Sequence, residues 1–127
     1  MIRRRILLVE DEPGLRRTLK DLLASSGYTV ETSGDGAEAQ ARAEHETFDL
    51  IVLDLTDPGG PSEALYTPDF YRACAARLER AGALTLHIAS PIAHPARIPS
   101  TPASLRQAFA VVTPYLVSIP LYGGLWI

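Results

Sequence analysis

The chain has 127 residues and a net charge of −3, which favours one globular domain and argues against nucleic-acid binding through bulk charge. A single cysteine, Cys74, excludes a disulfide within the chain and fits a reducing compartment, so we expect a cytoplasmic protein. The uncharged stretch after Arg106 is long enough to cross a bilayer, but prolines and glycines divide it into strand-length pieces. We therefore expect no membrane segment.

Apolar runs and turn residues predict alternating strands and helices along the chain. The expected order is a strand at 5–10, a helix from Pro13 to Gly27, a strand at 28–33, a helix at 35–46, a strand at 48–55, a helix from Thr67 to Gly82, a strand at 83–90, a short helix near 104–109, a strand at 115–120, and room for a last short strand at 123–127.

This alternation predicts an α/β fold, a three-layer doubly wound parallel sheet of the flavodoxin-like or Rossmann-like type. Counting strands in chain order, we expect the sheet order 2-1-3-4-5, with a short extra antiparallel strand at the C-terminus. We expect residues 1–127 to form a single domain. Ligands of such sheets bind at the carboxyl ends of the strands, which is where polar residues matter most.

Three carboxylates end two of the predicted strands. Glu10 and Asp11 follow the first strand, and Asp54 ends the strand at 48–55. If these strands are neighbours, the acids repel one another, and a hard cation such as Mg²⁺ relieves the repulsion through oxygen ligands. We therefore predict Glu10, Asp11 and Asp54 as metal ligands, with Asp54 as a candidate acceptor of a phosphoryl group.

The stretches RILLVEDEPG, SGDGAEA and FDLIVLDL resemble the first half of a response-regulator receiver domain, over residues 1–54. This resemblance implies that Glu10 and Asp11 bind Mg²⁺, that Asp54 is phosphorylated in a phosphorelay, and that Ser90 acts in the switch. The pattern is incomplete, because Ile119 stands where the family has a lysine.

From about residue 49 to 127, DLTDPGGPSEALYTPDFYR and PLYGGLW resemble the C-terminal half of a spermidine synthase, a polyamine aminopropyltransferase. This resemblance implies a polyamine site in which Asp54 acts on the attacking amine, Asp57 binds the diamine and Tyr122 lines the site. The family's glycine-rich nucleotide loop is missing, because VEDEPG follows the first strand. We therefore expect no nucleotide and no aminopropyl transfer.

Both resemblances meet in FDLIVLDLTDPGG, which predicts a hybrid with a receiver-like half at 1–54 and an aminopropyltransferase-like half at 55–127. The interpretation that follows is an engineered chimera without selected catalytic activity, and not an enzyme, that keeps an acidic Mg²⁺ pocket. The alternatives are a receiver module phosphorylated on Asp54 and a polyamine-binding remnant. The apolar edge at Leu121–Ile127 also predicts a homodimer.

Overall fold

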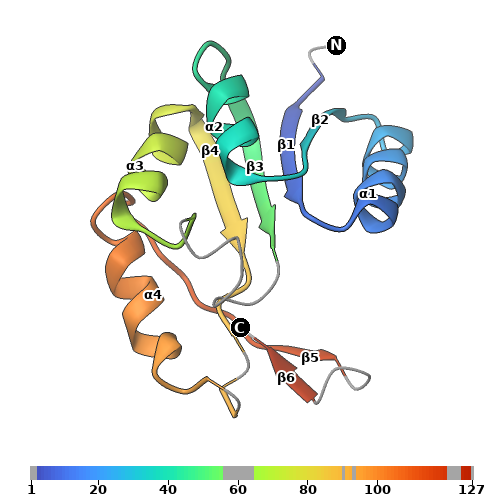
Figure 1. Ribbon diagram of the computed structural model, residues 1–127. Helices are drawn as coiled ribbons and strands as arrows, with labels where there is room; N and C mark the ends of the chain where they lie inside the picture. Colours follow the sequence, from blue (N-terminus) through green and yellow to red (C-terminus); the bar gives the residue numbers. More distant parts are fainter. Residues whose placement is uncertain (1–2, 56–64, 90, 93, 120–123, 127) are drawn as a thin grey trace.

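The computed structural model describes residues 3–55, 65–89, 91–92, 94–119 and 124–126. They form a four-stranded parallel sheet of order β2-β1-β3-β4 and a separate antiparallel pair, β5-β6 (Figure 1). The strands are β1 (Arg5–Glu10), β2 (Thr29–Ser33), β3 (Phe48–Asp54), β4 (Leu78–Leu86), β5 (Val117–Ile119) and β6 (Gly124–Trp126). The helices are α1 (Pro13–Ser25), α2 (Gly36–Ala43), α3 (Pro68–Ala76) and α4 (Arg97–Leu105).

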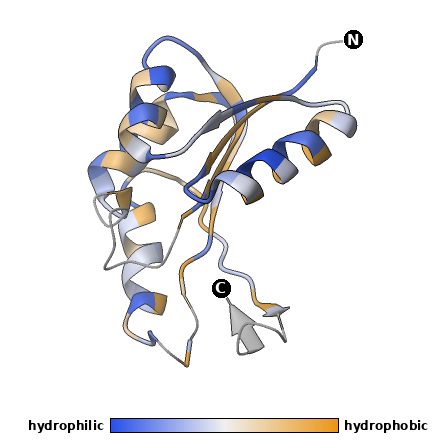
Figure 2. Ribbon diagram, turned by 45° about the vertical axis from the view of Figure 1, so that its right-hand side comes forward, coloured by the Kyte–Doolittle hydropathy of each residue, from blue (hydrophilic) through white to orange (hydrophobic). Residues whose placement is uncertain are grey.

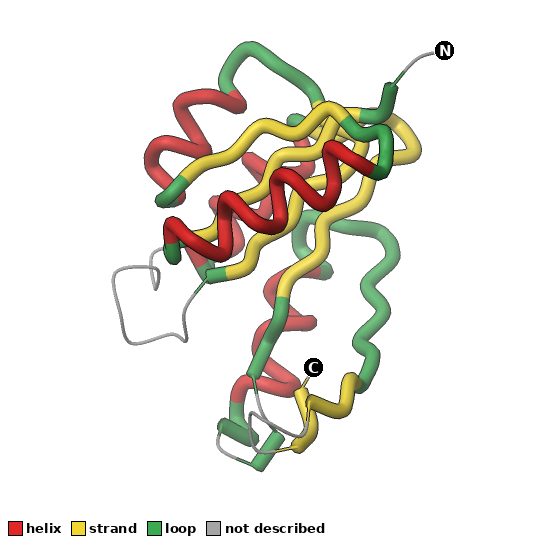
Figure 3. The backbone as a smooth tube through the Cα atoms, turned by 90° about the vertical axis from the view of Figure 1, so that its right-hand side faces the viewer, coloured by secondary structure: helices red, strands yellow, loops and turns green. Residues whose placement is uncertain are grey.

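The helices lie on both faces of the main sheet. Helix α1 covers one face, α2 and α3 cover the other, and α4 continues below α3 (Figures 1 and 3). This arrangement confirms the predicted doubly wound α/β fold for strands β1 to β4. Within the described residues, no helix is long and apolar enough to cross a membrane.

The hydrophobic core lies between the sheet and helices α2 and α3. The central strands are its most apolar part (Figure 2), and Val9 and Phe48 are fully buried. Cys74 lies in this core with 6% of its surface exposed, and burial raises the pKa of its thiol to about 12. Cys74 is therefore a packing residue whose thiol stays protonated at neutral pH.

Local sequence signals explain where the helices begin. Glu12 caps α1 by accepting a hydrogen bond from the Gly14 backbone N–H at 3.0 Å, and Pro13 occupies the first turn. Thr67 caps α3 in the same way, and Pro68 follows it. Helix α1 stops near Gly27, whose φ of 95° suits glycine.

Two predicted element boundaries and one predicted strand pairing are wrong. Strand β4 begins at Leu78, which was expected in the preceding helix, because the backbone there pairs with Phe48 at the start of β3. Helix α4 spans Arg97–Leu105 rather than residues near 104–109. The expected fifth strand of the main sheet is the short β5, which pairs only with β6. The extra antiparallel strand is present, but it lies beside β5.

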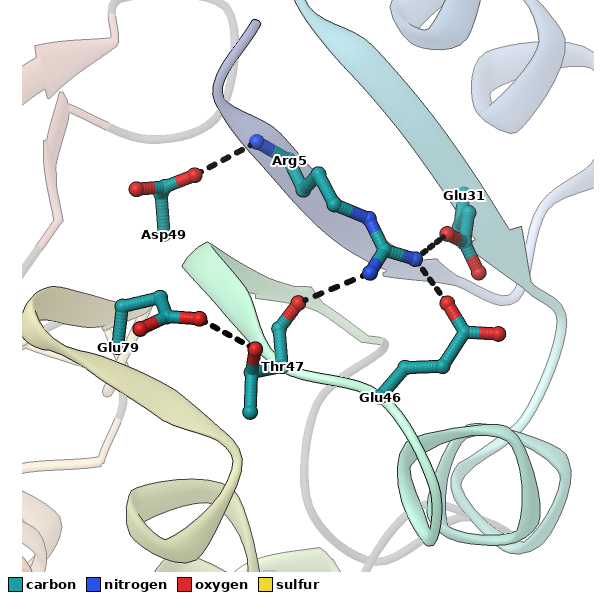
Figure 4. A network of polar contacts seen from close by, with 6 residues as sticks. All are labelled: Arg5, Glu31, Glu46, Thr47, Asp49 and Glu79. Atoms are coloured by element: carbon teal, nitrogen blue, oxygen red, sulfur yellow. Dashed lines mark hydrogen bonds and ion pairs between the residues drawn. The ribbon is translucent and has the colours of Figure 1, made fainter. Parts of the chain in front are cut away.

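At the amino ends of the strands, Arg5 joins three segments of the chain (Figure 4). Its guanidinium pairs with Glu31 on β2 and with Glu46 before β3, and it donates to the Thr47 carbonyl at 3.3 Å. Its backbone N–H donates to Asp49 Oδ2 at 2.8 Å. These contacts tie β1 to both of its neighbours in the sheet.

We expect Arg5→Gln to lower the free energy of unfolding by about 1 kcal/mol, because it breaks two ion pairs that are only partly shielded from solvent. Arg3→Gln, at an exposed position of the same arginine run, is the matched control and should change little. Chemical denaturation at low and high salt checks this prediction. Equal effects of the two substitutions would contradict it.

Candidate functional site

The parallel register of β1 and β3 brings two predicted site residues together. Glu10 and Asp54 are paired positions at the carboxyl ends of these strands. His87 directly follows β4, and its Nδ1 lies 3.5 Å from Asp54 Oδ1. We call Glu10, Asp54 and His87 the carboxyl-edge cluster, since Glu10 and Asp54 end β1 and β3 and His87 directly follows β4.

Glu10 is the buried member of the carboxyl-edge cluster, with 2% of its surface exposed. Its Oε1 accepts a hydrogen bond from the Glu12 backbone N–H at 2.9 Å, but its buried Oε2 has no donor among the described residues. Burial raises the pKa of Glu10 to about 7, and the neighbouring Asp54 carboxylate adds to the rise. When Glu10 carries a proton, the interacting Glu10 and Asp54 carboxyl groups hold one negative charge between them.

Asp54 is the accessible and ionised member of the carboxyl-edge cluster. Its side chain is 42% exposed, and that of His87 is 29% exposed. The hydrogen bond from His87 lowers the pKa of Asp54, more than its partial burial raises it. The edge of the sheet therefore presents one stable carboxylate to an incoming ligand.

A cavity of about 580 Å³ opens at the same edge of the sheet, between the N-termini of α2 and α3. Asp11, Asp35 and Asp69 are among its lining residues. Asp35 Oδ1 accepts a hydrogen bond from the Glu38 backbone N–H, and Asp69 pairs with Arg72. Gly36 allows α2 to pack closely here, because a Cβ at this position would fall 1.9 Å from Leu65 Cδ2. The three acids give this lining a negative character.

Sequence reasoning missed three polar residues of this edge, namely His87, Asp35 and Asp69. His87 stands inside the apolar run ALTLHIAS, and the strand was expected to continue past it. Its polar side chain, in a strand next to the one ending in Asp54, was a usable signal. Asp35 and Asp69 lie at helix starts, where acids are common for structural reasons.

The metal prediction receives no geometric support. In the part of the chain that the structure describes, no group of three or more His, Cys, Asp or Glu side chains is arranged to hold a metal ion. Mg²⁺ binding by Glu10, Asp11 and Asp54 thus stays a prediction. Ser90, Asp57 and Tyr122 lie outside the described residues.

The fold and the acidic carboxyl edge define a doubly wound α/β protein with a site suited to cations. The family model of the spermine/spermidine synthase domain matches residues 15–127, so the chain belongs to this family. That match begins in α1 and therefore includes most of the receiver-like half as well as the part after residue 54.

Individual relatives and structures agree with this assignment. The polyamine aminopropyltransferase of Nitrosomonas europaea is 53% identical over 93 residues, which cover 73% of this chain but only 28% of that protein. A crystal structure of spermidine synthase in complex with a transition-state analogue has a TM-score of 0.75 at 21% identity, covering 97% of this chain and 52% of that one. It therefore shares the fold.

The receiver resemblance also extends to the fold. A response regulator receiver domain from Methylobacillus flagellatus has a TM-score of 0.53 at 22% identity, over 67% of this chain and 69% of that one. The chain thus resembles both families, as the sequence indicated.

The interpretation as an engineered chimera without selected activity is wrong. The chain matches a family model over residues 15–127 and a natural aminopropyltransferase at 53% identity. The expectation that it is not an enzyme is contradicted by the same relatives, which are named as enzymes. The error came from giving the missing glycine-rich loop more weight than the motifs after Asp54.

We expect the stability of the protein to fall as pH rises from about 4.5 to about 7, because folding raises the pKa of Glu10 across this window. Below this window Glu10 is protonated in both states, and above it Glu10 is ionised in both. Within the window the unfolded chain loses the proton while the folded protein keeps it, so rising pH favours unfolding. Glu10→Gln should remove this loss and stabilise the protein by about 1–3 kcal/mol at pH 8.

Denaturation at pH 4, 6 and 8 measures this effect, with the exposed Glu44→Gln as the matched control. Asp54 acts in the opposite direction, since its lowered pKa adds stability that is lost only as pH falls below about 4. If the stability of Glu10→Gln changes with pH between 5 and 7 in the same way as that of the wild-type protein, the buried Glu10 is not the source of the stability loss.

Proposed function

We propose that this chain carries the amine-binding side of a polyamine aminopropyltransferase site, with Asp54 as the group that receives the accepting amine. The main support is the position of Asp54, a 42% exposed carboxylate at the carboxyl end of β3, where it pairs with His87. Asp11, which follows Glu10 at the same edge, lines a cavity of about 580 Å³. Asp54 is the first residue of DLTDP, which belongs to the stretch that resembles the family and lies within the matched residues 15–127.

The reaction needs a carboxylate at this place for two physical reasons. A polyamine is a cation at neutral pH, so a fixed negative charge binds it. Its attacking nitrogen must then lose a proton, because only the free lone pair can form the new C–N bond. As this bond forms, the C–S bond of a sulfonium donor breaks, and its electron pair leaves on sulfur as a neutral thioether.

The carboxyl-edge cluster offers a route for the proton. Asp54 holds the ammonium group by charge, and Glu10 and His87 both contact Asp54. A proton released to Asp54 is shared with Glu10, whose pKa burial raises to about 7. In this role Glu10 and His87 are positioning residues, since they act through Asp54.

The acidic cavity suits the cations of this reaction. Both the diamine and the sulfonium donor carry positive charge, and Asp11, Asp35 and Asp69 line about 580 Å³ of space. By the family resemblance, Asp57 binds the second amine and Tyr122 lines the site, although both lie outside the described residues. Measuring binding of the nucleoside donor in the absence of the amine tests the prediction that no nucleotide binds.

The test is incubation with decarboxylated S-adenosylmethionine and putrescine, followed by mass spectrometry of the polyamine and thioether products. Asp54→Asn should lower the rate by about a hundredfold or more, because it removes the charge that holds the amine. Asp21→Asn makes the same charge change on the exposed side of α1 and should leave the rate unaltered.

Binding is measured beside turnover, because the chain covers only 28% of the length of the Nitrosomonas europaea relative. Calorimetry with putrescine should give binding that Asp54→Asn weakens and Asp21→Asn preserves. If folded wild-type protein neither forms product nor binds putrescine more tightly than Asp54→Asn does, the proposal is wrong.

A further inference from the structure

Helix α4 carries a polar face that the proposed enzyme site does not use. Arg97, Ser100, Thr101 and Ser104 recur at intervals of three and four residues, so they lie along one side of the helix. Together with Tyr66, they line a pocket of about 300 Å³, which we call the α4 pocket. Among the described residues that line it, none is acidic. The pocket therefore combines several hydroxyl groups with a single positive charge.

Arg97 supplies that charge. In the part of the chain that the structure describes, it makes no ion pair with a carboxylate, unlike Arg5, Arg42 and Arg72. The Arg97 charge lowers the pKa of Tyr71 on α3, against the rise that burial causes. The guanidinium is therefore on the side of α4 that faces α3, and Arg97 is only partly exposed. A partly shielded cation without an anionic partner favours an anion from solution.

Thr101 is the most buried polar residue of the α4 pocket. It is 8% exposed, and its hydroxyl forms no hydrogen bond with another residue that the structure describes. A helical threonine commonly donates to a carbonyl of the preceding turn, as Thr18 does to the Gly14 carbonyl at 3.0 Å. Because buried polar groups are rarely left without a partner, the Thr101 hydroxyl is a donor that a ligand in the pocket can use.

The start of α4 adds to the preference for an anion. The helix spans nine residues, and its first turn contains no acidic side chain. Its N-cap, Ala96, has no side chain that accepts a hydrogen bond, and it also lines the pocket. The positive end of the helix dipole is thus not balanced by a carboxylate of the helix itself.

We propose that the α4 pocket binds a phosphate group, free or in a small phosphate ester, with Arg97 paired to its charge. The guanidinium fork can bind two phosphate oxygens at once, and the Ser100, Thr101 and Ser104 hydroxyls can donate to the oxygens that remain. A carboxylate has only two oxygens and would leave some of these donors unused. This inference does not depend on the proposed enzymatic function, because the acidic cavity and the α4 pocket share no lining residue.

NMR titration of the ¹⁵N-labelled protein tests the site, with inorganic phosphate and glycerol 3-phosphate as the two probes. Sodium chloride keeps the ionic strength constant, so that general screening does not change along the titration. The backbone amides between residues 97 and 104 should shift and saturate. Tighter binding of glycerol 3-phosphate identifies an ester site, and equal or tighter binding of inorganic phosphate identifies a site for the free ion.

Substitutions on α4 connect the binding to the named side chains. Arg97→Gln should raise the dissociation constant at least about tenfold, whereas Arg97→Lys keeps the charge and should retain more of the affinity. Thr101→Val keeps the shape of the side chain and should raise the constant about threefold, since it removes the buried donor. Arg106→Gln removes an exposed charge at the other end of α4, outside the pocket, and is the matched control.

Circular dichroism verifies that each variant folds. If the folded wild-type protein shows no saturating shift with either probe, the proposal is wrong. Shifts confined to segments other than α4 and Tyr66 also overturn it. An Arg106→Gln protein that loses as much affinity as Arg97→Gln shows attraction to general positive charge, and this result excludes a site built around Arg97.

Discussion

The pairing of β1 with β3 is the constraint on which the site depends. This register sets Glu10 opposite Asp54 at one end of the sheet. At the other end, the Arg5 backbone bonds to Asp49, and its side chain holds Glu31 and Glu46. A shift of this register by one residue would take Glu10 and Asp54 out of register with each other. The same contacts that fix the sheet therefore also fix the chemistry at its edge.

The two acids are chemically alike, and their surroundings make them different. Glu10 is 2% exposed and has one oxygen without a donor among the described residues, so burial favours its protonated form. Asp54 is accessible and bonded to His87, so it stays ionised. One negative charge therefore faces the solvent over a broad pH range, which suits a site that must attract cations without collecting self-repelling charge.

The sequence was sufficient for the fold because the two central strands, β1 and β3, are apolar runs and two helix starts carry Pro after a capping residue. It also predicted that Glu10 and Asp54 meet, since the order 2-1-3 makes their strands neighbours. It placed a strand at 115–120, where β5 lies, but not its pairing with β6, because the partner of a three-residue strand is chosen by tertiary pairing. His87 escaped notice because the end of β4 depends on pairing with β3.

The wrong interpretation of this chain as an engineered chimera has a physical explanation. Receiver domains and aminopropyltransferases are both doubly wound sheets, so acids at strand ends and a turn such as GDGA fit either one. The family match beginning at residue 15 shows that the first half alone does not discriminate between them. At this edge, burial raises the pKa of Glu10 and the hydrogen bond from His87 lowers the pKa of Asp54. Protonation of Glu10 therefore relieves the repulsion that the sequence led us to expect, and the arrangement of these acids does not by itself separate one family from the other.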